Sequence, residues 1–157
     1  MIRLVILICL LLPASCFPQA FINKSRDKVK RDLEKRIASD TIHTLLLETD
    51  TSLQYSIRDS QFQPADFIYT FDQSGKCKME EVIASCDSCL HKFLQSALGK
   101  KGYGWKKLND HLYISGFVQR RLLEIPRHNT GHSFLIRRMN WNRAVYNTLL
   151  VQKNQAK

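Results

Sequence analysis

The sequence lacks the short motifs that mark the common hydrolases and nucleotide-binding enzymes. It contains no Gly-x-Ser-x-Gly, no His-Glu-x-x-His and no glycine-rich phosphate-binding loop. Carboxylates are also few, with 14 Asp and Glu among 157 residues, and no two of them stand out as an acid–base pair. The sequence therefore favours a non-enzymatic protein, and it predicts no cofactor and no metal ion.

A long apolar run is missing from the body of the chain. After residue 12, no segment approaches the ~20 apolar residues that a helix needs to cross a bilayer, so we expect no transmembrane helix in the mature chain. Hydrophobic residues make up 44% and charged residues 24% of the sequence, as in folded globular proteins. The sequence predicts one domain over residues 21–152, followed by a polar tail over 153–157.

The N-terminus, by contrast, has the three parts of a secretory signal peptide. A short positively charged start at residues 1–3 precedes an unbroken apolar run over residues 4–12, which Pro13 ends. We predict a signal peptide over residues 1–20, with cleavage after Ala20. The protein is then exported, and its expected place is periplasmic, outer-membrane associated or extracellular.

A lipid anchor is the alternative interpretation of the same region. Pro13-Ala14-Ser15-Cys16 resembles a lipobox, in which Cys16 would be lipidated and become the new N-terminus. That modification would give a tethered protein in place of a free one.

The charge of the chain is strongly positive. Once Arg3 leaves with the leader, 23 Lys and Arg remain against 14 Asp and Glu. Such an excess attracts anionic surfaces, although scattered charges also suit an ordinary solvated surface. We expect the partner to be an unidentified protein or an anionic envelope component.

Nucleic acid is a further anionic partner to consider. One stretch places Lys100, Lys101, Lys106 and Lys107 around Tyr103 and Trp105. Basic residues next to stacking aromatics are typical of single-strand binding. Export argues against that function, and the two aromatics are equally typical of a protein core.

Hydrophobic periodicity gives the order of elements. A helix is predicted over residues 25–38, because Val29, Leu33 and Ile37 fall on one face, and a second over residues 87–98, ending at Gly99. Asn140 is the expected cap of a closing helix. Its expected inner face consists of Trp141, Val145 and Leu149. Strands are predicted at residues 53–57, 67–71, 77–84, 105–108, 112–115, 121–125 and 133–138, while the apolar run 42–48 is of undetermined type.

These elements predict an α+β fold. The order is helix, strands, helix, strands, helix, with a mainly antiparallel sheet and helices packed on one face. The turn at residues 72–76 contains Gly75, which can adopt a positive φ between two strands. The two helix-then-strands halves suggest a structural duplication, but no sequence identity between them supports it.

The most specific local motif is Cys86-Asp87-Ser88-Cys89, where a strand leads into a helix. A helix N-terminus favours the thiolate, and this is how thiol–disulfide oxidoreductases are built. Pro126 would then correspond to their cis-proline. The competing interpretation is a structural disulfide that joins Cys77 to Cys86 or to Cys89.

A redox or metal-handling role for Cys86 and Cys89 is thus the alternative function. Zinc would need a fourth ligand beside the three thiols, and His91 or His111 could supply it. The spacing does not demand such a site. His128 and His132, which flank a turn, are interpreted as exposed loop residues.

Residues 21–84 also carry a family-like pattern. The pattern consists of Phe21-Ile22-Asn23-Lys24-Ser25, Val29, Leu33, Leu53-Gln54-Tyr55, Ile68-Tyr69-Thr70-Phe71-Asp72 and Ser74-Gly75-Lys76. It resembles outer-membrane-assembly lipoproteins of the SmpA/OmlA type and β-lactamase-inhibitor-like modules, although Asn23 stands where that pattern prefers glycine. The chain is also similar to small exported proteins of unassigned role from Bacteroidetes. The resemblance implies a non-enzymatic envelope module for binding or scaffolding, and it carries over no functional residue.

Overall fold

The computed structural model describes residues 21–39, 44–58, 64–126 and 132–155. Within these ranges the elements are α1 (Arg26–Ser39), β1 (Thr44–Glu48), β2 (Ser52–Ile57), β3 (Ala65–Phe71), β4 (Cys77–Ala84), α2 (Asp87–Leu98), η1 (Lys101–Tyr103), β5 (Lys106–Asn109), β6 (Leu112–Ile114), β7 (Arg121–Glu124), β8 (His132–Arg138) and α3 (Arg143–Gln155). None of the helices in these ranges is long and apolar enough to cross a membrane.

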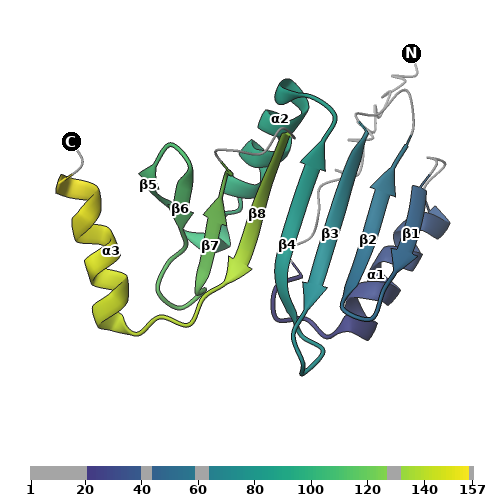
Figure 1. Cartoon of the computed structure of the whole chain (residues 1–157), viewed down its shortest axis with the longest axis horizontal. Helices are drawn as coiled ribbons and strands as arrows, with labels where there is room; N and C mark the ends of the chain where they lie inside the picture. The colour runs from purple at the N-terminus through teal and green to yellow at the C-terminus, as the bar shows by residue number, and fades with distance from the viewer. Residues whose placement is uncertain (1–20, 40–43, 59–63, 127–131, 156–157) are drawn as a thin grey trace, which may run out of the picture.

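The strands form one eight-stranded sheet in the order β1-β2-β3-β4-β8-β7-β6-β5, and every pairing is antiparallel. Each half of the chain is a helix followed by four strands that pair in sequence. The two halves join where β4 pairs with β8, which makes the sheet continuous (Figure 1). The α+β class and the antiparallel sheet are thus confirmed.

The main core lies on one face of this sheet. Burial alternates along β3, and the register places Tyr55, Phe67, Val82 and Phe134 side by side on four neighbouring strands. Period-two alternation of this kind is the pattern of a half-buried strand. Helices α1 and α2 lie behind the sheet in Figure 1 and bury their apolar faces against it.

A second, smaller core lies on the opposite face at the other end of the sheet. It consists of Ile114, Leu122, Trp141 and Tyr146. Ile114 and Leu122 are register partners, and Leu122 is adjacent in sequence to Leu123 of the main core, so the two leucines point to opposite faces. Helix α3 therefore covers only the β5–β7 end of the face opposite α1 and α2, and the prediction that all helices pack on one face is not met.

The closing helix also begins later than predicted. Asn142, and not Asn140, caps it, because the Oδ1 of Asn142 accepts a hydrogen bond of 2.9 Å from the backbone N–H of Val145. Val145 is 49% exposed, and Tyr146 occupies the inner position in its place. The helix continues to Gln155, into the residues predicted as a polar tail.

The remaining elements agree with the sequence to different degrees. The undetermined run becomes β1 from Thr44, and residues 42 and 43 lie outside the described residues. A short 3-10 helix, η1, separates α2 from β5, so the element order is not quite the simple one expected. Gly75 has the expected positive φ, 70°, in the turn between β3 and β4.

Candidate functional site

The candidate site begins where β4 ends and α2 begins. Cys86 has extended backbone angles, φ −155° and ψ 162°, and its Sγ accepts a hydrogen bond of 3.1 Å from the N–H of Cys89. The sulfur thus takes the place that a serine or aspartate oxygen usually has at a helix N-cap. The helix N-terminus therefore brings its free N–H groups to Cys86.

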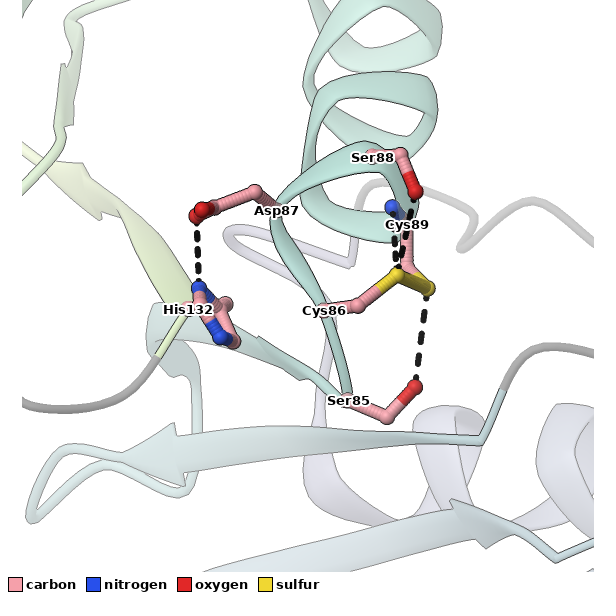
Figure 2. The surroundings of a disulfide bond; sticks show 6 residues. All are labelled: Ser85, Cys86, Asp87, Ser88, Cys89 and His132. Carbon is pink, nitrogen blue, oxygen red and sulfur yellow. Dashed lines mark hydrogen bonds and ion pairs between the residues drawn. A yellow bond between two sulfur atoms is a disulfide. The ribbon is translucent and has the colours of Figure 1, made fainter.

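Cys86 and Cys89 form a disulfide, with their Cα atoms 5.1 Å apart (Figure 2). The hydroxyl of Ser88 lies 3.1 Å from the Sγ of Cys86, and that of Ser85 lies 3.5 Å from the Sγ of Cys89. Cys89 is buried, whereas Cys86 is half-buried. Cys86 is therefore the sulfur that a thiol from another molecule reaches more easily.

The predicted bridge from Cys77 is wrong. Cys77 begins β4 and Cys86 follows the end of the same strand, and at ~3.3 Å a residue an extended chain of nine residues separates them by about 30 Å. A disulfide needs Cα atoms within about 7 Å. Cys77 is unpaired and fully buried, and this burial, together with the charge of Glu80, raises the pKa of its thiol to about 12.

A side-chain hydrogen bond joins the start of α2 to β8. The Nδ1 of His132 lies 2.6 Å from the Oδ1 of Asp87, as Figure 2 shows. His132 is the first residue of β8 and not a loop residue, while His128 lies outside the described residues. Sequence reasoning missed this contact because β4 and β8 become neighbours only in the folded sheet.

The other expected ligands do not join the cysteines. His91 is exposed on α2 and lies 2.8 Å from Gln95, and His111 lies in the turn between β5 and β6. No group of three potential metal ligands occurs in the part of the chain that the structure describes. Pro126 has no cis bond, since all described peptide bonds are trans, so the comparison with a cis-proline is wrong.

The two aromatic residues of the lysine-rich segment 100–107 make contacts within the protein. The rings of Tyr103 and Trp105 meet edge to face at 5.6 Å, and the Nε1 of Trp105 donates a hydrogen bond of 3.1 Å to the carbonyl of Ala97. The guanidinium of Arg121 lies 4.0 Å from the centre of the Tyr103 ring. Both aromatic side chains are thus engaged in contacts within the protein, as the alternative of core aromatics predicts.

An open hollow of about 810 Å³ lies between the start of α1 and the β3–β4 turn. Two of its charged side chains already have partners. Arg26 donates to the carbonyls of Thr49 and Asp50 and to Glu48, and Asp72 accepts from Arg138. These contacts hold two turns in place, and we assign no ligand to the hollow.

A larger feature is the sheet face opposite the main core over β1–β4 and β8, here named the open sheet face. No helix of the described residues packs on it. Ile68, Ile83 and Leu135 are half-buried at its centre, and Leu45 and Leu47 on β1 are 48% and 47% exposed. Its charges are largely paired across strands, in the ion pairs Arg58–Asp66 at 2.7 Å and Arg137–Glu124 at 3.1 Å.

Comparison of the chain with models of protein families, with curated proteins and with solved structures finds no match in any of the three.

Proposed function

We propose that the protein is exported and acts in the cell envelope as a small non-enzymatic binding or scaffolding module. The observation that carries this proposal is the open sheet face. Three helices cover the main core and the second core, but the centre of the sheet on this side presents Ile68, Ile83 and Leu135 without a covering helix among the described residues. An apolar area with a polar border is typical of a protein interface.

The chemistry of this face favours a protein partner over an anionic lipid or polymer. Apolar side chains lie at its centre, and both signs of charge lie around them in ion pairs. An anionic surface would instead seek unpaired lysines and arginines. The basic residues exposed on α1, such as Lys28 and Arg31, are the better site for such a surface.

Site-specific photo-crosslinking in the source cell tests this proposal. A photoreactive amino acid replaces Ile83 or Leu135 on the open sheet face, and Lys28 or Arg31 in the matched control positions on α1. We expect crosslinks to one protein, or to a few, from the first pair only. Crosslinks that form only from α1, to lipid or polysaccharide, would replace the protein partner with an anionic envelope component.

The disulfide supports a second candidate function, thiol–disulfide exchange. Cys86 is the more exposed cysteine and lies at a helix N-terminus, the position that lowers the pKa of a thiol. In such a reaction a thiolate of a reduced partner attacks the Sγ of Cys86, and Cys89 leaves as a thiolate. A second thiolate of the partner then attacks the mixed disulfide. Cys86 and Cys89 gain two electrons and two protons, and the partner ends as a disulfide.

The reduction potential of the pair separates the two functions. The Cys77→Ala variant is equilibrated with glutathione buffers, and the alkylated thiols are counted by mass spectrometry. A structural disulfide typically has a potential below about −300 mV, whereas catalytic pairs are more oxidising, between about −270 and about −120 mV. A value in the oxidising range, with catalysis of insulin reduction that Cys86→Ser abolishes, would favour the redox function.

A further inference from the structure

Glu80 is a carboxylate in the middle of an apolar core. It lies on β4 and is 5% exposed, on the face that α1 and α2 cover. Its Oε1 accepts hydrogen bonds from the backbone N–H groups of Phe21 and, at 2.8 Å, of Ile22. A buried carboxylate is costly unless charge and hydrogen bonds compensate it, so the contact with the chain at Phe21 needs an explanation.

Phe21 and Ile22, whose N–H groups contact Glu80, are tightly packed in the main core. Phe21 and Ile22 are both 2% exposed, and the ring of Phe21 meets that of Tyr69 edge to face at 5.1 Å. The N–H of Asn23 donates to the carbonyl of Cys77 at 2.9 Å, and Asn23 itself has a positive φ of 71°. The chain thus enters the main core at Phe21, which is the residue that follows the predicted cleavage point.

We propose that Glu80 is the receptor for the α-ammonium group that cleavage after Ala20 creates on Phe21. Hydrolysis of this peptide bond by a signal peptidase adds OH to the carbonyl carbon of Ala20 and H to the nitrogen of Phe21, which takes up a further proton at neutral pH. The new positive charge then lies in hydrogen-bond contact with Glu80. The inference rests on the export and on the cleavage site proposed above.

The order of events follows from burial. Phe21 and Ile22 are buried in the folded domain, so a protease cannot engage the residues that follow the cleavage point there, and cleavage has to precede folding of this segment. Removal of the leader then places a positive charge in direct contact with Glu80, in addition to the charges of Lys100 and Arg121 nearby. An exported chain that keeps its leader lacks this charge and folds to a less stable state.

The surroundings of Glu80 determine how its pKa differs between a chain with an α-ammonium group on Phe21 and a chain without one. When Phe21 is an amide, burial raises the pKa of Glu80 to about 7, while the N–H groups of Phe21 and Ile22 and the charges of Lys100 and Arg121 oppose the rise. The other titratable or charged groups that act around this part of the core are Arg36, Tyr69, Cys77 and Tyr103. An α-ammonium beside the carboxylate favours its charged form and lowers this pKa.

The raised pKa of Glu80 determines the direction in which stability changes with pH. A folded-state pKa above the ordinary 4.5 means that stability is fully present below pH 4.5 and is lost as pH rises toward about 7. We expect this loss in a chain that keeps Gln19 and Ala20. A chain that begins at Phe21 is expected to lack it, because its Glu80 is ionised in both states over this range.

The test compares four chains: one beginning at Phe21, one beginning at Gln19, and Glu80→Gln in each. Glu81→Gln, on the other face of β4, is the matched control. In the chain that begins at Phe21 we expect Glu80→Gln to raise the unfolded-to-folded ratio about 100-fold in urea titrations. In the chain that begins at Gln19 the same substitution is expected to have a much smaller effect. Equal effects in the two chains would overturn the inference.

A second measurement needs no variant at Glu80. Reductive methylation of the α-amino group of Phe21 is followed in the folded chain and in urea. We expect the folded chain to react at least about 100-fold more slowly, because the group is buried and paired. Equal rates would show that this amine is free, and would overturn the inference while export stands.

The cleavage site is tested separately, by intact mass and N-terminal sequencing of the chain secreted with its own leader. A first residue of Phe21 supports the inference. A first residue of Cys16 would remove its premise and show the lipoprotein form. Retention of Met1 would remove export as well.

Discussion

The two halves of the molecule have the same order of elements but bury apolar surface in different ways. In the first half, β1 to β4 have 5 to 8 residues and contribute apolar core residues from one face only, under α1 and α2. In the second half, β5 to β7 have 3 to 4 residues, and β7 buries Leu122 on one face and Leu123 on the other. A strand with few residues thus contributes to two cores, and α3 is needed to cover the second.

The halves are nevertheless not independent. Phe67 of β3 meets Phe93 of α2 edge to face at 5.5 Å, so the helix of the second half covers strands of the first. The continuous ladder between β4 and β8 joins them further. We therefore expect the main core to unfold as one unit, whereas the second core, which has fewer contacts, can open separately.

Phe67→Ala gives the largest expected effect. The side chain is 2% exposed and packs against Tyr55 as well as Phe93. Its removal leaves a cavity and should lower the free energy of unfolding by about 4 kcal/mol, in a single transition that CD and fluorescence follow together in urea. Leu47→Ala, on the exposed side of β1, is the control with little effect. Two separate transitions would show that the halves are independent.

Tyr146→Ala tests the second core. Tyr146 packs on Trp141 at 5.3 Å and on Phe117 at 5.6 Å, and its hydroxyl donates to the carbonyl of Ser115 at 3.1 Å. We expect its loss to destabilise α3 by about 3 kcal/mol, with a smaller effect on global unfolding because α3 opens first. Hydrogen exchange of amides in α3 against those in β3 measures this difference.

Val145→Ala is the matched control for this experiment. Val145 is the neighbour of Tyr146 on the outer face of α3, and a change at an exposed position is expected to shift stability by less than about 0.5 kcal/mol. Equal effects of the two substitutions would mean that α3 does not pack through Tyr146. Equal loss of protection in α3 and β3 would mean that the second core has no separate stability.

The first half was also the more predictable from sequence, for a physical reason. Alternation through Phe67, Tyr69 and Phe71 together with the turn at Gly75 predicts β3 and the strand after it, because these strands bury one face only. In the second half the consecutive Leu122 and Leu123 carry no alternation. The sequence therefore predicted a strand there, but not the second core that it serves.

The ends of the helices were likewise predictable only where residues near them in sequence determine them. Helix α2 has the predicted bounds, Asp87–Leu98 followed by Gly99, because local residues determine both ends, although Cys86 was not predicted as its N-cap. Asn140 and Asn142 are equally good caps by composition, and tertiary packing decides between them, since Trp141 is buried in the second core before the helix begins.

The candidate sites were predictable from the sequence only where their residues lie close together along the chain. Cys86 and Cys89 are three residues apart, so the motif itself indicated the pair. Glu80 had no such signal, because Lys78-Met79-Glu80-Glu81 is a polar stretch in which only the register of β4 shows which carboxylate points into the core. Asp87 and His132 likewise meet only through the pairing of β4 with β8.

Asp72→Asn has the smallest expected effect on stability, and it tests a side-chain contact between the two halves. Asp72, in the β3–β4 turn, accepts hydrogen bonds from the Ser74 hydroxyl at 2.7 Å and the Lys76 N–H at 3.0 Å, and from Arg138 of β8 at 2.6 Å. These three contacts hold the pKa of Asp72 well below its usual 3.8, and the hydrogen bond from the Ser74 hydroxyl contributes most. Its contribution to stability is therefore present above pH 3.8 and is lost as pH falls below that value.

The asparagine variant keeps an oxygen for the turn but loses the charge opposite Arg138. We expect its thermal midpoint to lie below that of the wild type at pH 7, and the difference to narrow as pH falls from about 4 to 2. Asp110→Asn is the matched control, because Asp110 pairs with Lys107 in a turn of the second half but is 86% exposed and spans no junction between the halves. If both variants lose the same stability, Asp72 acts only as a surface charge. If only Asp72 matters, and Arg138→Met removes its effect, then the contact that aligns β8 with the first half is an ion pair as well as a strand ladder.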